Sequence, residues 1–362
     1  MKNLTVVIVT YKTPEKIILD CLKSIDSEIK VLIVENSENF NHRNIMDLNF
    51  FKQAKILDGG MGQELLARGM KPNGTLWSAN ALLDENYHKL IFDTHSDFVR
   101  AGAEVIVTAT FTTRRKRLRD NGIEEKFEYL NKKAGEIAYN VKKKFPNILV
   151  AGGLPPQDLT YEADSRSEDE IINNFNEQAK LLNPYVDFFY FDVWSSIKEF
   201  KCGIEAIKEF KKPYLIGMHI SEGANLPSGE KINEIKDIID DQLLGIMLSC
   251  VSPENFKVNL KELKNLNVPF GFKINAFVTT IPKNGYSSTF SKSNGNPNEF
   301  LGQRKDLTPK NMALFVKKFK DAGATILGYI FLKELNTTKV LISLLAVCIG
   351  IYFVKTADNK KN

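Results

Sequence analysis

The sequence predicts an α/β protein whose main body is a parallel (β/α)8 barrel (TIM barrel). Two observations lead to this prediction. Eight short apolar runs are rich in β-branched and aromatic residues, and the stretches between most of them carry apolar residues at helical spacing. The alternation continues from residue 55 to residue 331, which is close to the roughly 250 residues typical of such a barrel. This regularity favours a closed barrel over an open sheet.

The predicted strands are the apolar runs at residues 55–60, 103–111, 147–154, 186–193, 213–220, 243–250, 269–276 and 324–331. The predicted helices lie near residues 84–101, 124–144, 168–182, 196–210, 230–241, 253–264 and 309–322. Two of these helices follow the capping residues Asp84 and Ser252. The loop at 277–308 is rich in Gly, Ser, Asn and Pro. We expect it to overhang the C-terminal face, where barrels of this kind carry their chemistry.

A separate, small βαβ unit is predicted at the N-terminus, over residues 1–45. The runs "TVVIVTY" (5–11) and "KVLIVEN" (30–36) are typical of strands, and residues 14–25 show helical spacing. No third strand follows, so we expect a poorly packed appendage outside the barrel body of residues 50–331. The segment resembles the opening of a family 2 glycosyltransferase, with Glu35 ending the second strand, but it lacks the Asp-x-Asp metal motif of that family. Glycosyl transfer is therefore a weak alternative function.

The C-terminal segment is apolar on every side. The run "VLISLLAVCIGIYFV" (340–354) contains no charged residue, and it predicts a helix over residues 334–356 that suits lipid or deep burial. Its 15 residues are fewer than the roughly 20 needed to cross a bilayer. A membrane anchor and a buried helix both stay open, with insertion favoured. Lysines after the run would then place the C-terminus in the cytosol.

Composition places the chain among ordinary folded proteins, with 43% hydrophobic and 26% charged residues. The net charge of +5 is spread over the chain, which argues against a nucleic-acid surface. The dense patch "RRKRLR" (114–119) is interpreted as a solvated helix face, with anion binding as the alternative. The N-terminus shows no cleavable signal. Four scattered cysteines, Cys21, Cys202, Cys250 and Cys348, form no disulfide framework. We therefore expect a cytoplasmic protein, with membrane association through the C-terminal segment as the alternative.

Polar residues at strand ends mark the predicted site. Asp58 with Gly59 places a carboxylate and an approachable backbone after the first barrel strand, Asp192 ends the fourth, and Cys250 ends the sixth. These side chains are expected to converge, because parallel strands end at one face. His219, at the end of the fifth strand, is predicted to be a hydrogen-bonded structural residue, since no second His lies at ligand spacing.

Five segments resemble the homocysteine S-methyltransferase family in order and spacing: "DGGMGQEL", "HSDFVRAGAEVIVTATF", "AGGLPP", the stretch from Cys250 to Pro253, and "DAGATILG". The resemblance covers residues 55–328. It implies a zinc barrel that transfers a methyl group from a small donor to the thiol of homocysteine, giving methionine. The donor stays open among S-methylmethionine, betaine and a methylated folate or related compound.

The resemblance also implies roles for single residues. Asp58, Gly59 and Asp192 would bind the substrate, and Asp192 stands where the family usually has a Glu that contacts the substrate amino group. Three cysteines would hold zinc and the substrate sulfur would take the fourth position. Cys250 matches one of these ligands.

The other two ligands of the family, in a Gly-Gly-Cys-Cys motif, have no counterpart. The chain reads Gly328, Tyr329, Ile330, Phe331 at that place, and neither Cys202 nor Cys348 is positioned by spacing to replace them. We therefore expect weak zinc binding and impaired methyl transfer. A non-catalytic, membrane-tethered barrel that binds a small amino acid or a partner is the alternative. The abrupt end of the likeness fits either a natural fusion or a fault in sequence assembly.

Overall fold

The computed structural model describes residues 5–10, 15–25, 30–35, 48–280 and 301–329. The chain divides into two compact units, Met1–Phe50 and Phe51–Asn362. The predicted C-terminal helix at 334–356 and most of the long loop at 277–308 fall outside the described residues. Within the described ranges, no helix is long and apolar enough to cross a membrane.

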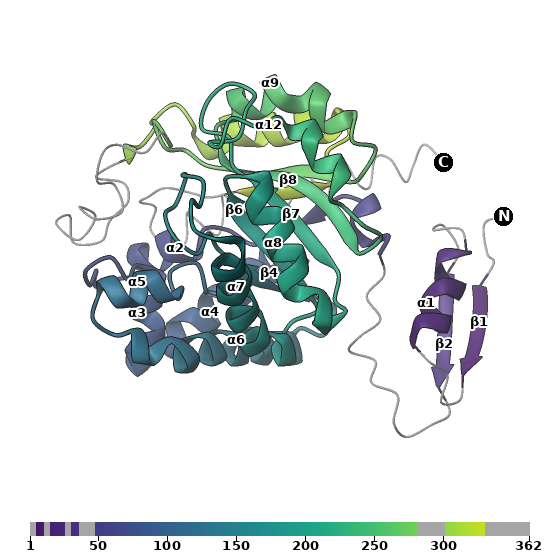
Figure 1. Cartoon of the computed structure of the whole chain (residues 1–362), viewed down its shortest axis with the longest axis horizontal. Helices are drawn as coiled ribbons and strands as arrows, with labels where there is room; N and C mark the ends of the chain where they lie inside the picture. The colour runs from purple at the N-terminus through teal and green to yellow at the C-terminus, as the bar shows by residue number, and fades with distance from the viewer. Residues whose placement is uncertain (1–4, 11–14, 26–29, 36–47, 281–300, 330–362) are drawn as a thin grey trace. The chain divides into compact units, whose positions relative to one another are not determined.

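The N-terminal unit is the predicted βαβ fragment, drawn in purple in Figure 1. Strands β1 (Thr5–Thr10) and β2 (Lys30–Glu35) run parallel, and α1 (Glu15–Lys23) connects them. Ile18 on α1 is buried, whereas its neighbour Ile17 is 59% exposed. Among the described residues of this unit, burial is thus found on one face of α1.

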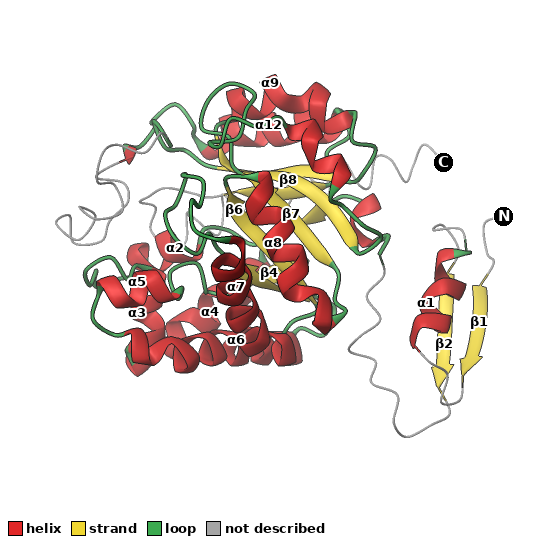
Figure 2. Cartoon of the chain, in the orientation of Figure 1, coloured by secondary structure: helices red, strands yellow, loops and turns green. Residues whose placement is uncertain are grey.

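All eight predicted barrel strands are present, all parallel (Figure 2). They are β3 (Lys55–Ile56), β4 (Val105–Val107), β5 (Leu149–Leu154), β6 (Phe188–Trp194), β7 (Tyr214–Met218), β8 (Leu243–Val251), β9 (Phe270–Ile274) and β10 (Ile326–Tyr329). Their order is β3-β10-β9-β8-β7-β6-β5-β4. The sheet closes where Leu57 bridges Val105 and the Asp58 amide donates to the Val105 carbonyl at 2.9 Å. The predicted α/β barrel is confirmed.

Strand β4 is shorter than the predicted 103–111 because a cluster of threonines ends it. The Thr110 hydroxyl donates to the carbonyl of Gly153 at 2.6 Å, and the Thr113 hydroxyl donates to the carbonyl of Thr110 at 3.0 Å. Threonine hydroxyls that bind nearby backbone favour turns over continued sheet pairing.

Helices cover the barrel as predicted at six of seven positions. They are α4 (His88–Arg100), α6 (Phe127–Lys144), α7 (Glu168–Leu182), α8 (Ile197–Ile207), α9 (Pro253–Lys264) and α12 (Pro309–Asp321). Short helices α2 (Met61–Ala67), α3 (Ser78–Leu83) and α5 (Arg115–Asp120) are added before and after β4. Ser252 caps α9, and Asp84 caps the 3-10 turn that leads into α4. Helices α9 and α12 are neighbours, and the rings of Phe256 and Phe319 lie 4.6 Å apart (Figure 1).

The predicted helix at 230–241 is wrong. The structure has only a 3-10 turn at Ile232–Asp237, with Ile232 and Ile235 buried. Residues three apart share one face of a 3-10 helix. Both isoleucines can therefore be buried against the barrel by one short 3-10 turn. The acidic residues Asp240 and Asp241 would stand unfavourably at the C-terminus of a longer helix.

Strands β9 and β10 approach each other closely at Gly271. A Cβ atom built on Gly271 would lie 1.8 Å from the backbone oxygen of Ile326. No side-chain rotation can relieve a contact with backbone, so this position requires glycine. The barrel therefore depends on one glycine at the seam between its last two strands.

Candidate active site

One cavity of about 100 Å³ lies at the C-terminal ends of the barrel strands. It is larger than the about 10–15 Å³ that a single water requires, so it has room for a small molecule. The predicted residues Asp58, Gly59, Asp192 and Cys250 all line it. Other lining residues include Trp77, Phe111, Arg117, Thr160, Tyr161, Lys273, Phe277 and Leu301. The structure therefore brings the four predicted residues together, as their positions at strand ends required.

Asp58 is fixed across the seam where the barrel closes. Its Oδ2 accepts a hydrogen bond from the Val107 amide at 2.9 Å and lies 3.6 Å from Nδ1 of His95. Asp58 and His95 are both buried. The carboxylate thus holds strand β4 against the end of β3 while it faces the cavity.

Asp192 and Lys273 form an ion pair in the cavity wall. Nζ of Lys273 lies 2.9 Å from Oδ2 of Asp192, and both side chains are buried. Oδ1 of Asp192 is buried and has no hydrogen-bond partner among the described residues. Burial lowers the pKa of Lys273, but the charge and hydrogen bond of Asp192 outweigh it and raise this pKa above its ordinary value. Lys273 is therefore an ammonium ion at neutral pH.

The backbone is strained at two residues that line the cavity, Val193 and Cys250. Cys250 has a φ of 59° and Val193, next to Asp192, has a φ of 70°. Both residues stand at register shifts in their strands, as expected for β-bulges. A positive φ is a rare outlier for a β-branched residue such as valine, and strain of this kind clusters at functional sites. The bulges turn the ends of β6 and β8 at the cavity.

The Cys250 sulfur is held by two polar side chains. It lies 2.9 Å from Oη of Tyr161 and accepts a hydrogen bond from Nδ2 of Asn275 at 3.2 Å. Burial raises the pKa of Cys250 to about 11, although the hydrogen bonds from Tyr161 and Asn275 lower it. The group is therefore a thiol at neutral pH.

The described residues do not fit a zinc ion. A protein zinc site requires three or four ligands. In the described part of the chain, no three His, Cys, Asp or Glu side chains lie close enough together to hold a metal. The positions of the two missing family cysteines, Ile330 and Phe331, fall outside the described residues, and neither side chain can coordinate a metal.

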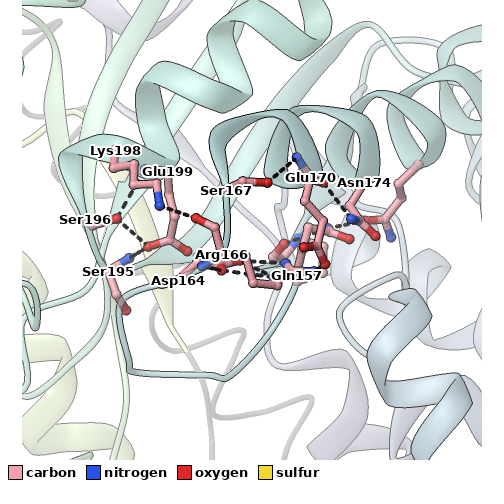
Figure 3. Close-up of polar contacts among 12 residues, drawn as sticks. Gln157, Asp164, Arg166, Ser167, Glu170, Asn174, Ser195, Ser196, Lys198 and Glu199 are labelled. Atoms are coloured by element: carbon pink, nitrogen blue, oxygen red, sulfur yellow. Dashed lines mark hydrogen bonds and ion pairs between the residues drawn. The ribbon is translucent and has the colours of Figure 1, made fainter.

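A partly buried polar network anchors the loop that carries Tyr161 (Figure 3). The Arg166 guanidinium donates to both carboxylate oxygens of Asp164, and Lys198 on α8 donates to the Arg166 carbonyl. Oε2 of Glu199 on α8 accepts from the Ser196 hydroxyl at 2.8 Å. The loop between β5 and α7 is thereby tied to the start of α8, just beyond Asp192.

Glu199 makes the stability of this network depend on pH. Burial raises its pKa to about 8, despite the hydrogen bond from Ser196, whereas an unfolded Glu has a pKa of about 4.3. The folded state therefore keeps a proton that the unfolded state releases, and this stabilisation is lost as pH rises from about 4 through 8. We expect the unfolding free energy to fall by about 2 kcal/mol between pH 6 and pH 8, and by less in Glu199→Gln.

Urea unfolding of both proteins at each pH checks this expectation. Glu205→Gln is the matched control, since Glu205 lies on the same helix but its side chain is 57% exposed. In the control, the free energy of unfolding should fall with pH as it does in wild type. Parallel curves for wild type and Glu199→Gln would show that Glu199 is ionised in the folded protein.

His219 has the structural role that the sequence predicted. Its Nε2 pairs with the Ser221 hydroxyl at 2.8 Å, and its Nδ1 lies 3.2 Å from the Ser249 carbonyl. Burial lowers the pKa of His219 to about 4, so the ring is neutral. It packs against the ring of Tyr161 with centroids 4.3 Å apart. Cys202 is buried in α8 and does not line the cavity.

The interpretation of the patch at 114–119 as a solvated face is wrong for two arginines. Arg114 is 1% exposed and donates to Oγ1 of Thr160 at 2.9 Å, and Arg117 is 6% exposed and lines the cavity. Arg119, with a 63% exposed side chain, matches the prediction. Helix α5 is short, and its residues Arg117 and Leu118 are buried, so one of its faces is covered by protein.

The cavity residues that sequence reasoning missed include Lys273, Tyr161 and Trp77. Lys273 had a signal, because it is the lone charge in the apolar run "PFGFKINA". Tyr161 had none, since it lies in a polar loop and reaches Cys250 only through the fold. Trp77, whose φ of 45° is also strained, directly precedes α3, and the sequence analysis did not predict this helix.

Known proteins of one family resemble this chain. The family model "Homocysteine S-methyltransferase" matches residues 55–328. The homocysteine S-methyltransferase YbgG of Bacillus subtilis is 25% identical over 232 residues, covering 58% of this chain and 73% of that protein. Homocysteine S-methyltransferase 1 of Saccharomyces cerevisiae is 24% identical over 306 residues, covering 75% and 88%.

The fold is also that of a solved relative. The metallated form of the homocysteine methyltransferase MmuM from Escherichia coli superposes with a TM-score of 0.63 at 20% identity, covering 81% of this chain and 95% of that one. The family match runs from the start of β3 to residue 328 in β10, and it includes Asp58, Gly59, Asp192 and Cys250. This chain belongs to the homocysteine S-methyltransferase family.

Proposed function

We propose that the barrel binds homocysteine in the cavity between Asp58, Asp192 and Cys250, and that methyl transfer to its thiol is impaired. The single observation that supports this most is the convergence of these three residues on one cavity inside the family match. The resemblance assigns Asp192 to the substrate amino group. Its unpartnered, buried Oδ1 offers the acceptor that such a group needs.

The proposed impairment of methyl transfer follows from the number of zinc ligands that the chain keeps. The thiol of a cysteine side chain has a pKa near 8.5, so an alkyl thiol of this kind is mostly protonated and weakly nucleophilic at pH 7. The family solves this with a metal held by three cysteines, of which this chain keeps Cys250. The cavity residues bind and orient the amino acid, while the group that would activate its sulfur lacks two ligands.

Calorimetric titration of the full-length protein with L-homocysteine tests the binding. We expect saturable binding that Asp192→Asn weakens by roughly 10-fold or more, because a charge-assisted hydrogen bond is lost. Asp93→Asn is the matched control, since Asp93 lies on α4 in an exposed pair with Lys89. It should bind like wild type.

Two outcomes would contradict the proposal. One is the absence of homocysteine binding by wild type, and the other is equal binding by Asp192→Asn with its fold intact by circular dichroism. A wild-type protein that binds homocysteine and also forms methionine at a rate typical of enzymes, about 1 per second or faster, would refute the impairment alone.

A further inference from the structure

We propose that Lys273 binds the α-carboxylate of the substrate amino acid while Asp192 holds its α-ammonium, so that their ion pair recognises a free amino acid. This inference rests on the proposed function, which names homocysteine but assigns no group to its carboxylate. Neither Lys273 nor any other cation of this chain had a role in that function.

The spacing of the pair matches the ligand. In an α-amino acid, the ammonium and the carboxylate are attached to the same carbon, so their protein partners must also be neighbours. Oδ2 of Asp192 and Nζ of Lys273 lie 2.9 Å apart, both in the cavity wall. Oδ1 of Asp192 is buried and has no hydrogen-bond partner among the described residues, so its capacity to accept is unused. An anion and a cation side by side present the complement of the two backbone charges of an amino acid.

The charge of the cavity agrees with a zwitterion. Of the described residues that line it, two are acidic, Asp58 and Asp192, and two are basic, Arg117 and Lys273. These formal charges cancel, whereas a cavity for a simple anion or cation would carry an excess of the opposite sign. Arg117 stands on α5, and Lys273 is the cation paired directly with Asp192. Lys273 is therefore the group that can hold the carboxylate of the same ligand.

The pair is costly as a purely structural feature. Removing two charges from water opposes folding, and well-packed apolar residues are often as stable in their place. Lys273 lies in strand β9 between Phe272 and Ile274, both fully buried. A charged side chain in such a strand, with its head at a cavity, is better explained by a ligand than by stability.

A ligand without the carboxylate isolates the contribution of Lys273. The probes are L-homocysteine and 3-aminopropane-1-thiol, which has the same thiol and amine but no carboxylate. We expect wild type to prefer homocysteine by roughly 10- to 100-fold in Kd, the range for a hydrogen-bonded charge. Lys273→Met should lose this preference, and its affinity for the aminothiol should be kept or increased because Asp192 is released from its partner.

Two further variants complete the experiment. Lys273→Arg keeps the positive charge and should keep the preference for homocysteine. Lys257→Met, which removes an exposed lysine on α9, should behave as wild type. Should Lys273→Met not fold, equal affinity of wild type for the two probes would still overturn the proposal.

The outcomes separate this inference from the proposed function. Equal affinity of wild type for both probes, or an equal loss for both in Lys273→Met, would overturn the role of Lys273 and leave homocysteine binding intact. If wild type binds neither probe, the proposed function fails, and this inference fails with it.

Discussion

Replacement of Tyr329, Ile330 and Phe331 by Gly, Cys and Cys is expected to raise the zinc content of the purified protein from nearly none to about one ion per chain. The change recreates the adjacent cysteines of the family motif next to Gly328, at the end of a strand that pairs with β9. With Cys250 they would supply three thiolates. Zinc is measured by elemental analysis after dialysis, and methionine formation is measured with each candidate methyl donor.

The same replacement in a Cys250→Ser background is the matched control. Two cysteines without Cys250 should bind zinc weakly, because a three-ligand site has become a two-ligand site. About one tightly held zinc in the unmodified protein would show that the metal has other ligands here. Cys202 and Cys348 would then be the first to substitute.

Gly271→Ala is expected to have the largest effect on stability. The added methyl group would lie 1.8 Å from the Ile326 backbone oxygen, so β9 and β10 must separate or the barrel must distort. We expect a loss of about 3 kcal/mol or more, the upper range for overpacking. Guanidinium unfolding followed by circular dichroism gives the change in midpoint.

Gly152→Ala in β5 is the comparison. Its added Cβ would meet only side-chain atoms, of Phe189 and Val186, at 3.2 Å, and these can shift by a few tenths of an ångström. Gly152→Ala should lower the free energy of unfolding clearly less than Gly271→Ala does. Similar midpoints for the two variants would mean that the β9–β10 seam is more compliant than its geometry indicates.

The sequence predicted the strands well because parallel strands that are buried on both faces form continuous apolar runs. The run at 186–193 became β6, whose residues are all buried. The helix predicted at 230–241 is not formed, because apolar spacing alone is ambiguous there. Two isoleucines three apart fit either an α-helix or a 3-10 turn. Only packing decided between them.

The candidate site was predictable where it depended on strand ends. Asp58, Asp192 and Cys250 follow apolar runs, and parallel strands bring such positions to one face. Contacts made by loop residues had no comparable signal. Tyr161 reaches Cys250 across 89 positions of sequence, and the burial of Arg117 depends on what covers α5. Periodicity carries no information about such pairings.

The left-handed bends at Val193 and Cys250 shape one end of the barrel through the backbone alone. These bends belong to the backbone of β6 and β8 and require no ligand from the end of β10. Under the proposed function, the cavity for the amino acid would therefore be shaped by backbone that the replaced zinc motif does not supply. We therefore expect that substitutions can remove or restore amino-acid binding and methyl transfer separately.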